Sequence, residues 1–128
     1  MTRSFSLQSL AEDFARDSGV PVKLTVSGMP RVIYPSVEVA FYRNAQEAMT
    51  NAVRHGQATA ISVRLDYSPD EVALSVSSNG RPPVGSIVKG LGLRGMEERI
   101  ELLGGTVETE TTDRFIVRSV VPYRNHAG

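Results

Sequence analysis

The 128-residue chain contains neither cysteine nor tryptophan. Without cysteine there is no disulfide framework, no thiolate metal site and no cysteine nucleophile. Without tryptophan, the usual intrinsic-fluorescence assay of ligand binding is lost. No apolar run approaches the roughly 20 residues of a membrane span, and the amino-terminal stretch MTRSFSLQSL lacks the apolar core of a signal peptide. We therefore expect a cytoplasmic domain that does not itself enter a membrane.

The chain also has no net charge, because fourteen Lys and Arg residues balance fourteen Asp and Glu residues. This balance argues against a nucleic-acid binder or a membrane-surface binder, which would need a basic excess or a basic stripe. Hydrophobic residues make up 41% and charged residues 22%, as in ordinary globular proteins. A chain of this length predicts a single domain over residues 1–128.

Apolar periodicity predicts a helix and then a strand at the start of the chain. Ser6 can cap a helix whose apolar residues recur at helical spacing and which ends at Gly19. The alternation of Val22, Leu24 and Val26 then predicts a half-buried strand with these side chains directed inward.

Residues 38–55, EVAFYRNAQEAMTNAVRH, are expected to form the helix around which the rest of the chain is arranged. Pro35 and Ser36 offer a stop and an N-cap, Glu38 places an acid in the first turn, and Gly56 follows the end. Its apolar side chains fall on one side: Phe41, Ala45, Met49 and Ala52.

The second half of the chain predicts two hairpins that flank a loop and a third helix. The expected segments are a hairpin over 58–77 that turns at 68–70, a mobile loop over 77–89, a helix over 90–105 with Met96, Ile100 and Leu103 inward, a hairpin over 106–122 that turns near Thr112 and Asp113, and a frayed tail over 124–128. This order predicts an α+β fold, a two-layer sandwich in which three helices cover one face of a mixed sheet.

Three polar residues of the central helix, Glu47, Asn51 and Arg54, lie at spacings of four and three and therefore point the same way. Such a row suits a phosphate ester with its magnesium ion. Asn can give the metal a neutral oxygen, Glu can orient or deprotonate an attacking group, and Arg can pair with phosphate oxygens. The alternative is a solvated helix face, so a second motif is needed.

The segment 90–95 reads Gly-Leu-Gly-Leu-Arg-Gly and matches the pattern GxGxxG. A Rossmann unit is disfavoured because the preceding residues form a Pro-rich loop instead of a buried strand, and the chain is too short for a second nucleotide-binding half. A Walker-type lysine motif is missing too. What remains is a glycine-rich start of a helix whose unpaired N–H groups can face phosphate, or a helix start with no ligand.

Together, NAQEAMTNAVRH, the hairpin ending in SSNG, the loop and GLGLRGM resemble the ATP-binding domain of bacterial two-component sensor histidine kinases. That domain belongs to a superfamily with gyrase B subunits, ninety-kilodalton chaperones and MutL proteins, and the similarity is strongest to the nitrate- and desaturase-type kinases. It extends from Leu7 through Pro122. The resemblance implies the Bergerat-type ATPase fold, with ATP and Mg2+ as the bound molecules.

The resemblance also implies a role for each matched residue. Glu47 would be the catalytic acid that orients the reacting water or hydroxyl, Asn51 the magnesium ligand, and Arg54 and His55 neighbours of the phosphates. The other implied nucleotide-binding residues are Ser78, Asn79, Gly80, Gly90, Gly92, Leu93, Arg94 and Gly95. The implied partners are the dimerisation and phosphoacceptor helices of its own kinase, which are absent here, and a response regulator. The parent protein can be bound to the inner membrane.

Two residues depart from the family pattern in the first glycine box. Ser78 stands where the family has the aspartate that accepts a hydrogen bond from the adenine amino group. A neutral acceptor in its place should cost about 1–2 kcal/mol, or roughly tenfold in affinity, and should weaken discrimination against guanine. Pro82 replaces a glycine at the root of the lid, and its fixed φ should stiffen that hinge.

His55 is not expected to be the phosphoacceptor, because it lies inside the ATP-site helix. Its alternative role is only to close the C-terminus of that helix, where an imidazolium is favourable. Three functions remain open. The chain could be the catalytic domain of a sensor histidine kinase, a stand-alone anti-sigma-factor kinase that phosphorylates a serine, or a degenerate interaction module that binds no nucleotide.

Overall fold

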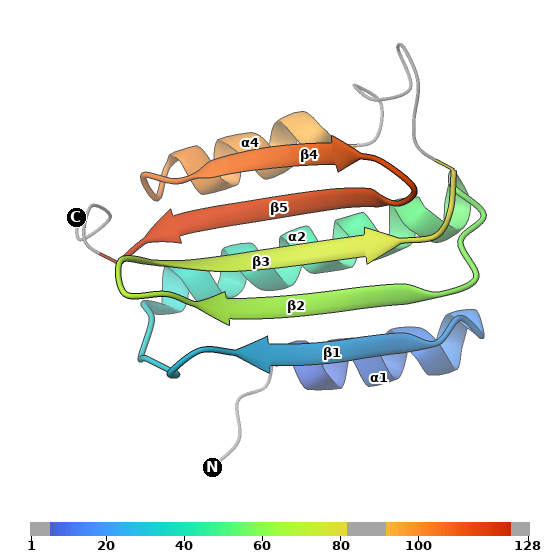
Figure 1. The fold of residues 1–128 in the computed structure, drawn as a ribbon, viewed down its shortest axis with the longest axis horizontal. Coiled ribbons are helices and arrows are strands. Elements are labelled where there is room, and N and C mark those ends of the chain that lie inside the picture. The colour runs from blue at the N-terminus through green and yellow to red at the C-terminus, as the bar shows by residue number, and fades with distance from the viewer. Residues whose placement is uncertain (1–5, 82–91, 124–128) are drawn as a thin grey trace.

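The computed structural model describes residues 6–81 and 92–123, and in these ranges three helices lie on one face of a five-stranded sheet (Figure 1). The helices are α1 (Leu7–Ser18), α2 (Pro35–Arg54) and α4 (Leu93–Glu101). The strands are β1 (Val22–Ser27), β2 (Ile61–Tyr67), β3 (Glu71–Ser78), β4 (Thr106–Thr111) and β5 (Phe115–Pro122). The predicted two-layer α/β sandwich is confirmed.

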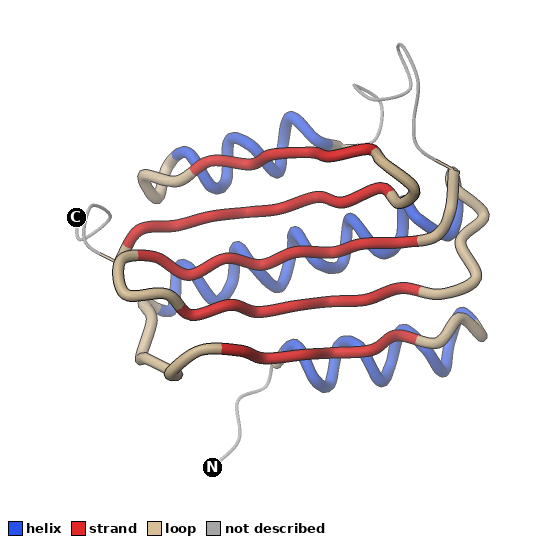
Figure 2. Tube along the Cα trace, viewed as in Figure 1, coloured by secondary structure: helices blue, strands red, loops and turns tan. Residues whose placement is uncertain are grey.

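The strands follow the order β1-β2-β3-β5-β4. β1 and β2 are parallel and are connected through α2, whereas the other neighbours are antiparallel, so the sheet is mixed as expected. Both predicted hairpins are present, with turns between Tyr67 and Glu71 and between Thr111 and Phe115. Figure 2 shows the described helices behind the strands, and none of them covers the other face of the sheet, which is called the uncovered face below.

The core lies between α2 and the central strands. Val76 on β3 is paired with Val63 on β2 and with Val117 on β5, so three buried valines form one row under the helix layer. The largest fully buried apolar side chains of the core are Val37, Phe41, Met49, Val63, Val72, Leu74, Met96, Ile100 and Val121. Since burial of such side chains is the main favourable contribution to folding, α2 and α4 are fixed to the sheet by their apolar sides.

The start of α2 differs from the prediction. The helix begins at Pro35, Tyr34 is its N-cap without a side-chain hydrogen bond, and Ser36 lies inside the first turn. Proline suits the first helical position because its fixed φ matches the helix and its missing N–H would have no partner there. The expected start at Glu38 and the expected Ser36 cap are therefore wrong, while the C-terminal end near His55 is confirmed.

Helix α1 has the predicted ends. Ser6 accepts a hydrogen bond from the Ser9 amide, and Gly19 closes the helix with φ of 77°. The strand that follows is less buried than expected, because β1 is an edge strand. Val26 in particular is 52% exposed, so its expected burial is wrong, although alternation places it on the same face of β1 as the partly buried Val22 and Leu24.

Helix α4 ends at Glu101, and a turn leads to Gly104, which has φ of 81°. The expected loop over 77–89 begins later than predicted, because its first two residues complete β3. Residues 82–89 of that expected loop, which include Pro82, lie outside the described residues, as do Gly90 and the expected frayed tail over 124–128. Among the described helices, none has the length and apolar character needed to cross a membrane.

Candidate functional site

The C-terminal half of α2 carries the predicted polar row beside its buried side. Ala45 and Met49 are completely buried under the helix, whereas Glu47 and Asn51 are only partly buried. Arg54, at the end of the row, is exposed. Because one helix fixes these positions, the carboxylate, the amide and the guanidinium lie along one edge of α2.

The carboxylate of Glu47 is bound by an arginine of α4 that the sequence did not single out. Nη1 of Arg99 donates a hydrogen bond to Oε1 of Glu47 at 3.2 Å and another to Oδ1 of Asn44 at 2.7 Å. Nδ2 of Asn44 in turn donates to Oγ of Ser119 on β5 at 3.1 Å. This network joins α2, α4 and the sheet through polar side chains, and Asn44 and Ser119 are both buried.

Gly92 brings the glycine segment directly against Glu47. It is the N-cap of α4, with φ of 77°, and a Cβ atom at this position would lie 2.7 Å from Oε2 of Glu47. Any other residue would therefore be strained by its backbone, and its Cβ would require the carboxylate of Glu47 to shift. The two motifs that the sequence separates by more than 40 residues thus meet at one point of the structure.

The first turn of α4 has no side-chain cap. Leu93 is buried, and Gly95 is partly buried. Arg94 is exposed, and its Nε lies 3.9 Å from Oε2 of Glu98. A Cβ at Gly95 would meet only Arg99, at 4.0 Å, so packing in the described protein does not require glycine there. The backbone N–H groups of this turn can face an anion, which the positive end of the helix dipole favours.

The end of β3 reaches the same region of the molecule (Figure 1). Ser78 is 3% exposed and continues the row of Val76 toward the helix layer. Asn79 is held by the chain that precedes β2, because its Oδ1 accepts hydrogen bonds from the amides of Thr59 and Ala60. Its side chain therefore has a structural role, a finding that the sequence did not indicate.

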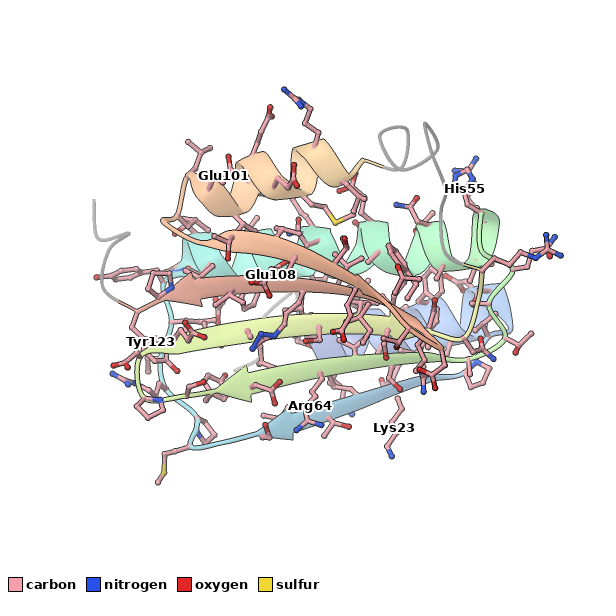
Figure 3. The ribbon with its side chains drawn as sticks, turned by 45° about the horizontal axis from the view of Figure 1, so that its top comes forward. Lys23, His55, Arg64, Glu101, Glu108 and Tyr123 are labelled. Atoms are coloured by element: carbon pink, nitrogen blue, oxygen red, sulfur yellow. The ribbon has the colours of Figure 1, made fainter. Side chains whose placement is uncertain are left out.

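Gly80 packs on the end of α2. A Cβ at Gly80 would lie 2.6 Å from the carbonyl oxygen of Gly56, and the same oxygen accepts a hydrogen bond from the Arg81 amide at 2.7 Å. This contact holds the end of β3 beside the end of α2. His55, the C-cap of α2, is exposed, and Figure 3 shows it at that end of the helix, away from the strands.

A bound metal ion would have few protein ligands in this region. Within residues 6–81 and 92–123, no group of three or more His, Cys, Asp or Glu residues could hold a metal ion. Mg2+ suits such a place because it keeps several waters and is bound through one or two protein groups together with substrate phosphates. Asn51, one helical turn after Glu47, offers the neutral oxygen that this donor set needs.

The structure thus brings together some of the predicted site residues. It places Gly92 against Glu47 and joins Gly80 to the end of α2, while Pro82 and Gly90 lie outside the described residues. Sequence reasoning missed Arg99 and Asn44. A signal for Asn44 existed, since it is a polar residue inside the apolar stripe of α2, three positions after Phe41 and four before Ala48.

Comparison with known proteins places the chain in a family. The family described as histidine kinase-, DNA gyrase B- and HSP90-like ATPase matches residues 36–125. The sensor histidine kinase LnrJ of Bacillus subtilis strain 168 is 37% identical over 116 residues, which cover 89% of this chain and 29% of LnrJ. The chain therefore spans less than a third of this relative.

Solved structures show the same fold. The blue-light activated histidine kinase EL346 of Erythrobacter litoralis has a TM-score of 0.74 at 19% identity, covering 94% of this chain and 45% of that protein. The ATP-binding domain of PrrB from Mycobacterium tuberculosis has a TM-score of 0.65 at 26% identity, and the match covers 93% of this chain and 92% of that domain. With the family match over residues 36–125, the chain belongs to the histidine kinase-, DNA gyrase B- and HSP90-like ATPase family.

Proposed function

We propose that this domain binds Mg-ATP at the corner formed by α2, α4 and the end of β3, and donates the γ-phosphate to a histidine. That histidine lies on the dimerisation helices of the parent kinase, and the phosphate passes on to a response regulator. The observation that carries the proposal is the close approach of Gly92 to Glu47. A Cβ atom added at Gly92 would lie 2.7 Å from Oε2 of Glu47. It places a carboxylate at the start of the helix whose N–H groups can hold phosphate.

Each part of the corner has a role in this reaction. The amides at the start of α4, from Leu93 to Gly95, face the phosphates, and Arg94, Arg54 and His55 can supply positive charge around them. Asn51 would hold Mg2+, which when bound neutralises charge on the β- and γ-phosphates. Gly80 and Asn79 support the nucleotide side by fixing the end of β3, and Gly90 would complete the phosphate side.

Glu47 acts on the attacking group. The imidazole nitrogen bonds to the γ-phosphorus while the bond from that phosphorus to the bridging oxygen breaks, and ADP leaves with the bonding electrons. Glu47 orients the imidazole and accepts the proton that it releases. Most of the acceleration comes from positioning and charge neutralisation, as phosphoryl transfer generally requires.

Ser78 is the residue that decides the adenine contact. It is buried, faces the helix layer and is neutral, so it can accept a hydrogen bond from the adenine amino group but more weakly than a carboxylate would. We place the domain in the cytoplasm, whether or not its parent is anchored in the inner membrane, and expect no nucleic-acid partner.

Calorimetric titration of Mg-ATP into the wild-type domain tests the proposal. We expect binding, and we expect Ser78→Asp to strengthen it about tenfold through a charged acceptor. Ser77→Asp is the matched control, because Ser77 is the neighbouring serine on the opposite face of β3 and should leave the affinity unchanged.

Failure of the wild-type domain to bind, repeated at a second temperature in case the enthalpy is near zero, would instead support an interaction module without nucleotide. A domain that binds Mg-ATP yet phosphorylates a serine of a separate protein, and no histidine, would support the anti-sigma-factor kinase. Equal affinity for ATP and GTP analogues would support the expected loss of discrimination at Ser78.

A further inference from the structure

We propose that Arg99 is a positioning residue that fixes the orientation of the Glu47 carboxylate; the inference rests on the proposed catalytic role of Glu47. The starting observation is that one nitrogen, Nη1 of Arg99, serves two acceptors. It lies 3.2 Å from Oε1 of Glu47 and 2.7 Å from Oδ1 of Asn44. Arg99 therefore connects a residue of the site to a residue of the core.

The core end of this connection is rigid. Asn44 and Ser119 are 2% and 1% exposed, and they are joined by a hydrogen bond of 3.1 Å between α2 and β5. A buried amide that bonds both a hydroxyl and a guanidinium has its rotamer set by these partners. Arg99, whose side chain is 26% exposed, is thus anchored before it reaches Glu47.

The site end would be mobile without this anchor. The Glu47 side chain is 40% exposed, and an unrestrained glutamate on a helix surface samples several rotamers. Arg99 holds Oε1, while Oε2 is the oxygen that faces Gly92 at the start of α4. The two carboxylate oxygens thereby have different roles: Oε1 is restrained, and Oε2 is presented toward the phosphate corner.

A planar guanidinium is suited to this task because its donors have fixed directions, whereas a lysine ammonium on its flexible stem fixes direction less well. The effect on catalysis should therefore depend on geometry as well as charge. A displaced reacting group can cost about a hundredfold in rate even when binding is retained. Arg99 should thus influence turnover and leave the affinity for Mg-ATP nearly unchanged.

Autophosphorylation of the full-length kinase that carries this domain, together with calorimetric binding of Mg-ATP, tests the inference. We expect Arg99→Met to lower the rate at saturating Mg-ATP by about ten- to a hundredfold while Kd changes less than about threefold. Arg99→Lys should recover part of the rate. Arg64→Met is the matched control, because Arg64 also pairs with a carboxylate but on the uncovered face of the sheet, and it should change neither value.

A double-mutant cycle separates positioning from a direct phosphate contact. In a Glu47→Gln background, Arg99→Met should cause little further loss of rate, since its effect passes through Glu47. An equal loss in both backgrounds, an unchanged rate in Arg99→Met, or a rate loss that follows Kd would overturn the inference while leaving the proposed function intact. Wild-type kinase that neither binds Mg-ATP nor autophosphorylates would overturn the proposed function, and the inference with it.

Discussion

Two arginine–carboxylate pairs on opposite sides of the sheet differ in what surrounds them. Arg99 and Glu47 meet among the helices, where Asn44 and Ser119 continue the network into the core. Arg64 and Asp66 meet on the uncovered face of β2, at 2.8 Å, with Ser27 donating a hydrogen bond to the same carboxylate (Figure 3 labels Arg64). The N–O distance of the pair on β2, 2.8 Å, is shorter than the 3.2 Å of the pair among the helices, yet the β2 pair lies on the face of the sheet opposite the candidate site.

The contrast shows that the distance within an ion pair does not measure its importance. An ion pair near the surface adds between about 0 and 1 kcal/mol to stability, because solvent screens it and the side chains lose freedom. The pair among the helices matters through what it orders, since its carboxylate faces Gly92 at the start of α4. Substitutions on the two sides should therefore separate effects on turnover from effects on stability.

The largest effect on stability and rate together is expected for Gly92→Ala, which disrupts the contact between Gly92 and Glu47 on the helix side of the sheet. The added Cβ would collide with Oε2 of Glu47, and alanine at φ of 77° adds about 1–2 kcal/mol of backbone strain. We expect the free energy of unfolding to fall by at least that amount and autophosphorylation to fall at least tenfold, because Glu47 is displaced. Urea denaturation and a rate measurement on the same variant check both.

Gly95→Ala is its matched control on the same helix. The Cβ would meet only Arg99, at 4.0 Å, in helical backbone, so this variant should be more stable by about 0.4–1 kcal/mol. Similar losses of stability in the two variants would mean that the backbone at Gly92, and its approach to Glu47, are not as described. Weaker Mg-ATP binding by Gly95→Ala without loss of stability would support phosphate approach at this turn.

A comparable loss of stability, without backbone strain, is expected for Asn44→Ala, which removes the anchor of the same network. The change leaves Arg99 and the buried Ser119 without their shared partner, so the free energy of unfolding should fall by about 1–3 kcal/mol. Gln46→Ala is the control, because Gln46 is an exposed residue of the same helix. Equal denaturation midpoints for the two variants would contradict a structural role for the network.

The smallest effect is expected on the uncovered face, for Asp66→Asn. Burial opposes ionisation of Asp66, but hydrogen bonds from Ser27 and Arg64 and the charges of Arg64 and Arg118 outweigh it, so the pKa of Asp66 lies below its ordinary value of 3.8. The folded state therefore binds fewer protons than the unfolded state, and the stabilisation is present above pH 3.8 and lost as the pH falls through the folded pKa.

We expect Asp66→Asn to lower the free energy of unfolding by less than about 1 kcal/mol at pH 7, without change in Mg-ATP affinity. Urea denaturation from pH 7 downward should show the difference between wild type and variant shrink in acid. A difference that grows as the pH falls would show that the sign of the shift is wrong, and altered Mg-ATP binding would show that the two sides of the sheet are coupled.

The sequence predicted the elements well wherever periodicity and turn chemistry agreed. Alternation in β2, β3 and β5 and the apolar stripe of α2 gave the sandwich, and Gly19 closed α1 as expected. Two local errors have simple causes. A proline can either stop or start a helix, and here it starts α2 at Pro35. Val26 is exposed because β1 is an edge strand, and nothing in the sequence marks it as one.

By itself, the sequence determined the residues of the candidate site that come in short motifs. Glu47 and Asn51 share one helix, and Gly92 and Gly95 begin another, so local spacing indicated the two motifs and the family resemblance gave each residue its expected role. Only the tertiary structure decided which groups meet across long separations: Arg99 with Glu47, 52 residues apart, and Asn44 with Ser119, 75 apart. Such contacts depend on how helices pack on the sheet, which is set by burial over the whole core and leaves no trace in the spacing of any one segment.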